Sequence, residues 1–555
     1  MENRKPGLRS AEVTEGLSRS GHRSLLLSMG WTREETGKPL VAVVNSWTEV
    51  VPGHSHLRTV ADAVKRGILA AGGTPLEFNT ISVCDGLAQG HGGMAYSLPS
   101  RDLVAATCEV MLEAHRFDGA VFISSCDKST PGMLMAAARV DIPAVFITGG
   151  YMEPGEFEGR KITISQLREY TGEVLGGTRT QDSLMEAEEC ACMGGGACAM
   201  MGTANTMQAL AEALGMAMPG TATVPAMGGL RLRQAMEAGR RVVSLIRENL
   251  RPSAILTPAA LRNALRVDMA IGGSTNSLLH LPAIARAAGV RLTLDDIDAI
   301  GRSTPHLAAI NPSGLATVAD LNRAGGIPAV QKALLPLLEE QRSVSGYTLT
   351  EIAAAARWSD PEVIRPLDRP HKPDGGVAVL RGNLAPGGAV VKTAAVRREM
   401  WRFQGPALCF DSMEEAVEAV TGRQVPEGSV VVIRYEGPVG GPGMREMQYI
   451  TSIFYGMGYG EHSALITDGR FSGATRGPVI GHITPEAATG GPLGVVRDGD
   501  LIEIDIAARR LHLAVPEAEL ARRLSAFQPK RKEVKGILRH YAESVGPTDE
   551  GAWLF

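Results

Sequence analysis

Three consecutive residues, Cys126, Asp127 and Lys128, place a thiol, a carboxyl group and an amine side by side. Thiolates are preferred ligands of iron and carboxylates are preferred ligands of Mg²⁺, so adjacent residues could serve two different metals. Taken alone, such a triplet is more often a small core cysteine beside a surface ion pair. The other segments that could carry chemistry decide between these two interpretations.

A second segment carries Cys190, Cys192 and Cys198 in a glycine-rich run. Glycines allow the unusual backbone angles that a loop around a metal cluster needs. The pattern differs from a four-cysteine zinc site, which would require a second Cys-x-x-Cys pair. By itself the segment is equally compatible with a redox or regulatory thiol. Together with Cys126, it favours an iron–sulfur cluster.

Asp85 precedes a glycine at the end of a predicted strand. It could share one Mg²⁺ with Asp127, because this ion usually takes one or two protein carboxylates and keeps positions for water and substrate. An ordinary Asp-Gly turn is the alternative. Cys84 would point to the opposite face if the strand continues, so we interpret it as structural.

Two later segments offer further candidates. The glycine- and proline-rich run 437–443 leads to Arg445 and Glu446, and its backbone N–H groups could bind an anion. It lacks the Lys-Ser/Thr ending of a phosphate-binding loop, so nucleotide binding is not predicted. Arg445 is a candidate substrate ligand, although two solvated charges at a helix start are the simpler interpretation. Ser472 has no histidine at the spacing of a Ser-His-Asp hydrolase and could equally be a turn serine.

The composition of the chain excludes several classes of protein. The 555 residues are 44% hydrophobic, 21% charged and 5% aromatic, with a net charge of -4, which gives no reason to expect nucleic acid as a partner. Residues 1–15 are charged and lack the apolar core of a signal peptide, and no apolar run is long enough to span a membrane. We therefore expect a cytoplasmic protein. Its seven cysteines favour metal or redox chemistry over disulfides.

The first part of the chain alternates strand and helix patterns. Apolar, β-branched runs predict strands at 40–44, 120–124 and 144–148, and helical spacing predicts helices at 57–71 and 100–115. This alternation predicts an α/β domain with a parallel sheet covered by helices. In such sheets the chemistry lies beyond the carboxyl ends of the strands, which is where Cys126 to Lys128 stand.

The sequence predicts an N-terminal α/β domain over 1–360, a linker over 361–376 and a second domain over 377–555. Further helices are predicted at 205–216, 230–249 and 329–357. Short strands between Gly-Pro turns, at 377–380, 389–392, 430–435 and 501–506, indicate that the second domain is a β-barrel or sandwich. A basic helical tail over 518–541 follows.

These segments together resemble the dihydroxy-acid dehydratase and phosphogluconate dehydratase family over nearly the whole chain. The resemblance is carried by NSWTEVVPGH (45–54), DG with GHGGM (85–94), CDKSTPGM (126–133), GGSTN (272–276), GNLAP (382–386), GGPGMRE (440–446) and DGRFSG (468–473). It implies an N-terminal α/β domain and a C-terminal β-barrel domain similar to the swivelling domain of aconitases. It also implies a homodimer or homotetramer.

The resemblance also implies roles for single residues. It assigns Cys126 and Cys198 as iron–sulfur ligands, Asp85, Asp127 and Glu446 as Mg²⁺ ligands, Lys128 as a carbamylated lysine that binds the same ion, and Ser472 as the general base. Many family members carry a third cluster cysteine in a Pro-Cys-Asn segment, where this chain has Gly53 between Pro52 and His54. Glycine at this position occurs in the branch with an oxygen-labile cluster. We therefore expect [4Fe–4S] rather than [2Fe–2S], with Cys192 as the candidate third ligand.

The implied reaction is the dehydration of a 2,3-dihydroxy acid, such as 2,3-dihydroxyisovalerate or 2,3-dihydroxy-3-methylvalerate, to a 2-oxo acid of valine or isoleucine synthesis. Ser472, as an alkoxide stabilised by the metal field, would remove the C2 proton while the cluster assists loss of the C3 hydroxyl. A sugar-acid dehydratase of the same family is the alternative. A non-enzymatic iron–sulfur sensor would need a basic face or docking segment. A metal-free sugar-binding module would leave the thiols and acids unexplained.

Overall fold

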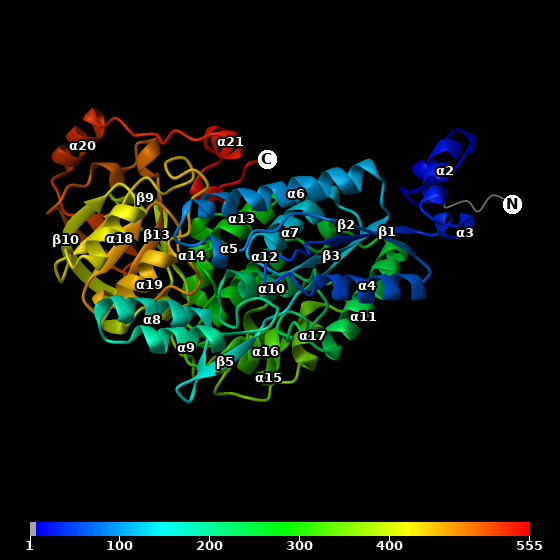
Figure 1. Cartoon of the computed structure of the whole chain (residues 1–555), viewed down its shortest axis with the longest axis horizontal. Coiled ribbons are helices and arrows are strands. Elements are labelled where there is room, and N and C mark those ends of the chain that lie inside the picture. Colours follow the sequence, from blue (N-terminus) through cyan, green and yellow to red (C-terminus); the bar gives the residue numbers. More distant parts are fainter. Residues whose placement is uncertain (1–6) are drawn as a thin grey trace.

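The structure is a computed structural model that describes residues 7–555; residues 1–6 of the charged N-terminal segment lie outside the described part. The described residues form a four-stranded parallel sheet, a closed eight-stranded barrel and a small three-stranded sheet (Figure 1). None of the helices in this part of the chain has the length and apolar character needed to cross a membrane.

The parallel sheet has the strand order β2-β1-β3-β4. Its strands are β1 Leu40–Asn45, β2 Thr74–Asn79, β3 Gly119–Ser124 and β4 Ala144–Thr148. Strands β1, β3 and β4 are buried along their whole length, because helices cover both faces of the sheet. This confirms the predicted α/β fold. Strand β2 was not predicted because it contains Pro75 and Glu77, which an edge strand tolerates.

The helices around the sheet and below it form the α/β domain. They are α1 Ala11–Thr14, α2 Ser20–Ser28, α3 Arg33–Thr36, α4 Leu57–Ala70, α5 Asp85–Ala88, α6 Ser97–Ala114, α7 Ser129–Val140, α8 Ile164–Gly176, α9 Gln181–Cys190, α10 Thr203–Ala213, α11 Gly229–Glu248, α12 Pro258–Ile271, α13 Ser277–Ala287, α14 Leu294–Ser303, α15 Val318–Ala324, α16 Gly326–Ala333 and α17 Leu349–Ala355. The helix predicted over 329–357 is two helices, α16 and α17, because a 3₁₀ turn containing Pro336 ends the first.

Helices α4 and α11 lie against each other on one face of the sheet (Figure 1). They approach closely through two glycines. A Cβ atom on Gly67 would lie 2.0 Å from the Met236 oxygen, and one on Gly239 would lie 2.2 Å from the Val64 oxygen. Any side chain at either position would push the helices apart, so the contact requires glycine on both.

The C-terminal domain is built on a closed barrel with the strand order β10-β11-β12-β13-β9-β8-β15-β14. Its strands are β8 Ala378–Gly382, β9 Ala385–Val391, β10 Arg402–Phe410, β11 Val430–Ile433, β12 Ala464–Thr467, β13 Val479–Thr484, β14 Leu501–Asp505 and β15 Arg510–Leu513, with helices α18 Met413–Thr421 and α19 Gln448–Gly456 between them. The predicted β-barrel domain is confirmed. Closure leaves no free sheet edge.

Two segments outside the parallel sheet and the barrel bring the two domains together: the C-terminal tail and the region of the small three-stranded sheet. The tail predicted as one helix over 518–541 is two, α20 Glu517–Ala526 and α21 Gly536–Ser544, with Pro529 between them. Beyond α21 the chain returns to the α/β domain, where Arg101 donates to the Gly551 oxygen at 3.0 Å. In the small sheet, strands β5 Glu153–Phe157 and β6 Arg160–Ile162 lead into helices α8 and α9 beside the barrel, and strand β7 Cys192–Met193 follows α9 (Figure 1).

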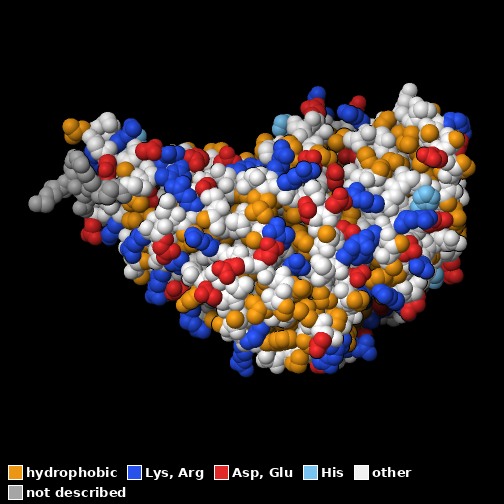
Figure 2. All heavy atoms as spheres, turned by 180° about the vertical axis from the view of Figure 1, so that it is seen from behind, with side chains coloured by type: hydrophobic (Ala, Val, Ile, Leu, Met, Phe, Trp, Pro, Cys, Tyr) orange, Lys and Arg blue, Asp and Glu red, His pale blue; other side chains and the backbone are white. Residues whose placement is uncertain are grey.

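The positions of the predicted domain limits, 360 and 376, stay predictions. The core of the α/β domain includes Val377, Val379 and Val390, so the two domains share apolar packing near the junction. On the face of the molecule in Figure 2, acidic and basic side chains are interspersed, without an extended surface of one sign.

Candidate active site at the domain junction

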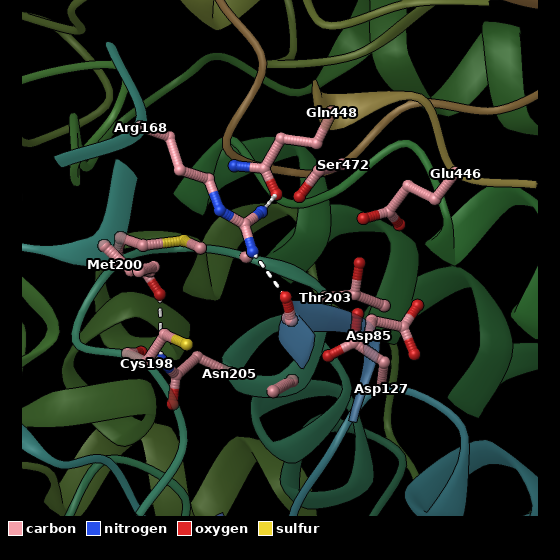
Figure 3. Close-up of a pocket in the computed structure, with 14 residues that line it drawn as sticks. Asp85, Asp127, Arg168, Cys198, Met200, Thr203, Asn205, Glu446, Gln448 and Ser472 are labelled. Carbon is pink, nitrogen blue, oxygen red and sulfur yellow. Dashed lines mark hydrogen bonds between the residues drawn. The ribbon is translucent and has the colours of Figure 1, made fainter. Parts of the chain in front are cut away.

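Two acidic side chains lie beyond the carboxyl-terminal edge of the parallel sheet. Asp85 is the first residue of α5 and Asp127 comes three residues after the end of β3. The carboxylate of Glu446, from the barrel-domain loop between β11 and α19, meets them. One carboxylate oxygen of each residue lies within 4.8 Å of those of the other two. Figure 3 shows the three side chains around one space. The structure thus brings together three predicted Mg²⁺ ligands from both domains.

Two buried cations lie against these acids. Lys128 Nζ donates to Asp85 Oδ2 at 2.7 Å and lies 3.8 Å from Asp127 Oδ2. Arg470 donates through Nη1 to Glu446 Oε2 at 2.6 Å and through Nη2 to Asp85 Oδ2 at 3.4 Å. Burial disfavours the Asp85 carboxylate, but Lys128 and Arg470 outweigh it, so the pKa of Asp85 lies below its ordinary value. Burial and the charge of Asp85 raise the pKa of Asp127 to about 7.

Neutral side chains fix the orientation of the acids. Ser97 Oγ donates to Asp85 Oδ1 at 2.6 Å. Asn276 Nδ2 and Gln89 Nε2 each donate to Glu446, both at 2.8 Å. Such partners orient ligands for a metal. Sequence reasoning missed all three roles and that of Arg470, although Asn276 and Arg470 stand in two of the segments that carried the family resemblance.

Ser472 lies in the same pocket as the acids. Its hydroxyl oxygen accepts a hydrogen bond from the Ala474 N–H at 3.2 Å. The pocket is lined by Asp85, Gly86, Asp127, Ile164, Arg168, Cys198, Met200, Gly202, Thr203, Ala204, Asn205, Glu446, Gln448 and Ser472. Figure 3 shows Ser472 between Gln448 and Glu446, with Cys198 across the pocket.

The backbone of Cys126 is hydrogen-bonded to the buried side chain of His54. The Cys126 backbone N–H donates to His54 Nε2 at 2.9 Å, and His54 Nδ1 lies 2.6 Å from the Ser46 oxygen. Because a carbonyl oxygen can only accept and an amide N–H can only donate, Nδ1 carries the proton and the ring is neutral. Burial lowers the pKa of His54 to about 4, which agrees with a neutral ring.

The thiols beside the pocket are unfavourable places for negative charge. Burial raises the pKa of Cys126 well above its ordinary value, and the charges of Cys84, Asp127 and Cys198 add to the effect. Burial raises the pKa of Cys198 to about 12, and the charges of Cys192 and Cys84 make the next largest contributions. Thiolates here need a cation to form.

Gly53, where the family resemblance leads us to expect a cysteine, lies directly against Cys126. A Cβ atom on Gly53 would lie 2.5 Å from the Cys126 sulfur, 3.5 Å from the Gly196 oxygen and 3.6 Å from Ser125 Oγ. The Ser125 hydroxyl is buried and has no hydrogen-bond partner within the described residues. The space around the Cys126 sulfur therefore contains an unused donor, and a side chain at 53 would require that sulfur to move.

Two further cysteines, Cys192 and Cys84, lie close enough to Cys198 to affect its pKa. Cys192 is exposed at strand β7, near enough to Cys198 to raise its pKa. Cys84, which we interpreted as structural, is half-buried immediately before Asp85 and affects the pKa of both Cys126 and Cys198. Its approach to Cys126 could not be inferred from strand alternation, because the chain leaves the strand after residue 79.

The structure does not bring Arg445, the predicted substrate ligand, into the pocket. Its guanidinium donates to Glu436 Oε2 at 3.0 Å and to Glu414 Oε1 at 2.6 Å. The arginine that does line the pocket is Arg168 of α8, which donates to the Gly86 oxygen at 2.8 Å and to Gln448. Nothing in the sequence around 168 distinguishes it from a surface arginine.

The donor sets fit two unlike metals. Three carboxylates around one space suit Mg²⁺, which prefers oxygen ligands. Buried cysteines with raised pKa values suit iron, whose charge would offset the cost of the thiolates. The unpartnered Ser125 hydroxyl adds a donor for a group bound at Cys126.

Comparison with known proteins agrees with this geometry. Residues 38–352 match the model of the dihydroxy-acid/6-phosphogluconate dehydratase N-terminal domain, and residues 362–552 match that of the C-terminal domain. A dihydroxy-acid dehydratase of Halothermothrix orenii is 48% identical over 98% of this chain and 100% of its own length. Dihydroxy-acid dehydratases of Ignicoccus hospitalis and Pyrococcus abyssi are 52% and 51% identical, over 96% and 98% of this chain and 97% and 99% of their own lengths. The chain belongs to the dihydroxy-acid/6-phosphogluconate dehydratase family.

Proposed function

We propose that the chain is a hydro-lyase that removes water from 2,3-dihydroxy acids, such as 2,3-dihydroxyisovalerate and 2,3-dihydroxy-3-methylvalerate, and releases 2-oxo acids. One observation carries the proposal: a single pocket combines three carboxylates, the Ser472 hydroxyl and the Cys198 thiol. These groups supply oxygen ligands, a proton acceptor and a sulfur ligand within reach of one small substrate. The names of the relatives support the dihydroxy-acid substrate.

In this proposal Asp85, Asp127 and Glu446 hold Mg²⁺, and Cys126 and Cys198 hold the iron–sulfur cluster. When bound, Mg²⁺ would spread the negative charge that develops as the C2 proton leaves, and the cluster would make the C3 hydroxyl a better leaving group. Arg470 and Asn276 keep Glu446 directed at the shared space.

Lys128 is proposed to bind the same Mg²⁺ after carbamylation. As an ammonium it lies 2.7 Å from Asp85 Oδ2, where it competes with a metal ion for that carboxylate. Carbamylation would replace the positive charge by a negative one and remove this competition. Mass spectrometry of the native protein, with one added CO₂ on the peptide that contains Lys128, tests this step; an unmodified lysine in fully active protein contradicts it.

Ser472 is proposed to take the C2 proton. Serine is ordinarily far too weak an acid to serve as an alkoxide, so its pKa has to be lowered by its surroundings. The Ala474 N–H, 3.2 Å from the hydroxyl oxygen, contributes because a donor stabilises the charged form more than the neutral one. A Mg²⁺ ion held by the three carboxylates would supply the remainder.

The pocket wall bears on the choice between dihydroxy acids and sugar acids. Ile164 and Met200 give the pocket an apolar side, which suits the branched alkyl end of 2,3-dihydroxyisovalerate. Arg168 and Gln448 give it a polar side, and this keeps a sugar-acid dehydratase as the second candidate. Turnover of 2,3-dihydroxyisovalerate compared with a panel of pentonates and hexonates separates the two.

The cluster is proposed to be [4Fe–4S], because Gly53 leaves no third cysteine in that segment. Cys192 is the third ligand proposed from the sequence, and Cys84 is the candidate that the structure adds, since it influences both Cys126 and Cys198. Iron analysis of Cys84→Ala and Cys192→Ala decides between them. We expect iron loss in Cys84→Ala and normal iron in Cys192→Ala; the reverse result assigns Cys192.

We propose a homodimer or homotetramer in the cytoplasm, as the family resemblance implies. The described part of helix α2 has no buried residue, and Leu25 and Met29 on and beside it are 70% and 62% exposed. The proposal rests on the family resemblance, since only a large contiguous apolar patch would by itself mark a contact surface. Light scattering at several protein concentrations measures the assembly, and a monomer at all of them contradicts the proposal.

Anaerobic purification followed by iron, sulfide and magnesium analysis tests the whole proposal. We expect iron and acid-labile sulfide, an optical spectrum of an iron–sulfur cluster and turnover of 2,3-dihydroxyisovalerate that depends on Mg²⁺. Protein that contains neither metal and still turns over this substrate contradicts the proposed site.

A further inference from the structure

The loop that carries the proposed base is pressed into the domain junction. A Cβ atom on Gly473, next to Ser472, would lie 2.8 Å from the Ser274 Cβ and 2.9 Å from the Gly202 Cα. Ser274 and Gly202 belong to the α/β domain, whereas Ser472 belongs to the barrel domain. The position of the Ser472 hydroxyl therefore depends on how firmly this loop is held against the other domain.

Lys392 connects the two sides of this junction. It directly follows β9, and its side chain is buried, with 4% of the residue exposed. Its Nζ donates to the Gly473 oxygen at 2.5 Å and to the Met201 oxygen at 3.3 Å. Gly473 adjoins Ser472, and Met201 lies between two residues that line the pocket, Met200 and Gly202. One amine thus binds the backbone beside the serine and the backbone of the opposite wall.

The surroundings of Lys392 make its burial costly. Burial lowers the pKa of Lys392 to about 7, against the charge of Asp268. Burial likewise raises the pKa of Asp268 to about 7, although Ser277 Oγ donates to its Oδ2 at 2.6 Å. Asp268 Oδ1 has no hydrogen-bond partner within the described part of the chain. An apolar residue would avoid this cost, which points to a role beyond packing.

We propose that Lys392 is a positioning residue for Ser472: by holding the Gly473 and Met201 carbonyl oxygens it keeps the serine hydroxyl at the place where the C2 proton is removed. The inference rests on the proposed function of Ser472 as the base. It adds a residue that touches neither substrate nor metal and that none of the motifs in the sequence singled out.

Lys372 offers a matched control. Its Nζ also donates to backbone oxygens, those of Thr393 at 2.5 Å and of Ala394 and Val396 at 3.2 Å, on the segment that follows Lys392. It makes no described hydrogen bond to the Ser472 loop. Loss of Lys372 therefore reports what a half-buried amine that binds backbone oxygens contributes to local structure alone.

The test compares Lys392→Met with Lys372→Met in anaerobically purified, metal-loaded protein. We expect Lys392→Met to lower kcat for 2,3-dihydroxyisovalerate by about 100-fold or more, with KM within about threefold, because a misplaced base affects the transition state and not binding. Iron content, magnesium content and Tm should match those of Lys372→Met. A kcat within about threefold of Lys372→Met overturns the inference.

Two further variants keep the test decisive. If Lys392→Met has a lower Tm or metal content than the control, Lys392→Gln, which retains a donor, should fold and give an intermediate kcat; a kcat equal to wild type overturns the inference. In Ser472→Ala, adding Lys392→Met should cause no further loss, because a positioning residue acts through the serine. Normal turnover of Ser472→Ala alone contradicts the proposed base, whereas inactive Ser472→Ala beside normal Lys392→Met contradicts only the role of Lys392.

Discussion

The oxygen side of the site, formed by Asp85, Asp127 and Glu446, differs from its sulfur side, formed by Cys198 in the pocket and Cys126 beside it. Lys128 and Arg470 lie against the acids and lower the pKa of Asp85 in spite of its burial. The main charged neighbours of Cys126 are other thiols and acids, which raise its pKa further.

This difference shows that the protein prepares its two metal sites by different means. On the oxygen side, Lys128 and Arg470 keep Asp85 charged when no ion is bound, whereas Asp127, with a pKa of about 7, is about half protonated at neutral pH. The sulfur side favours protonated thiols until a metal arrives, so metal binding there should release protons. The predictions below test this contrast, beginning with the largest expected effect.

Replacing either proposed cysteine ligand should abolish binding of the iron–sulfur cluster. We expect Cys126→Ser and Cys198→Ser to give colourless, inactive protein, because iron–sulfur clusters depend on thiolate ligands. Iron analysis and the visible spectrum measure the change. Cys409→Ser, which alters a half-buried cysteine of the barrel domain, is the control and should stay brown and active. Brown, active protein from either of the first two variants refutes the ligand assignment.

Replacing Ser472, the proposed base, should leave the binding of both metals unchanged. Ser472→Ala is expected to lower kcat by about 10²- to 10⁴-fold and to abolish exchange of the C2 proton with solvent, with iron and magnesium unchanged. Ser463→Ala changes another buried serine of the barrel domain and should retain wild-type kcat. Proton exchange at the wild-type rate in Ser472→Ala would eliminate this serine as the base.

Buried His54, which accepts a hydrogen bond from the Cys126 backbone N–H, should make the free energy of unfolding of the metal-free protein fall at acid pH. The pKa of His54 is about 4 in the folded chain and about 6.5 when exposed, so the unfolded state binds the proton more tightly. The stability contributed by neutral His54 is present above pH 6.5 and is lost as the pH falls towards 4, by up to about 3 kcal/mol. Denaturant unfolding of metal-free protein should show this slope, and His54→Gln should flatten it. An unchanged slope in His54→Gln assigns the effect to other groups.

Removing one hydrogen bond to a proposed Mg²⁺ ligand should have the smallest effect on activity. Asn276→Ala removes the donor 2.8 Å from Glu446 Oε2 and should weaken Mg²⁺ binding by about tenfold, while iron content stays normal. Magnesium titration of activity and binding calorimetry measure the change. Asn263→Ala, at a buried asparagine that contacts Glu339 and Gln341 instead, is the control. Loss of iron in Asn276→Ala would show that the two sides are not independent.

The sequence predicted the residues whose side chains have distinctive chemistry at strand ends, such as Asp85 and Cys126, and it predicted the α/β and barrel folds. It did not predict Asn276 as a partner of Glu446, because 170 residues separate them and amides are common everywhere. The sequence did not predict the role of Lys392 either, because its partners are backbone oxygens that no sequence pattern marks.

Some elements were missed because local preference and tertiary position disagree. Pro75 lowers the strand signal of β2, which is tolerated because β2 is an edge strand. Pro336 and Pro529 each split a segment that composition alone described as one helix. In each case the local sequence does not say how the segment packs against the rest of the protein.

The glycine contact between α4 and α11 affects how related sequences should be interpreted. Gly67 and Gly239 lie on helices that cover the sheet, and neither lines the pocket. Because no side chain fits at either position, evolution should allow them as little variation as the catalytic groups. An alignment-based search for functional residues would therefore select two positions whose restriction comes only from the distance between two helix backbones.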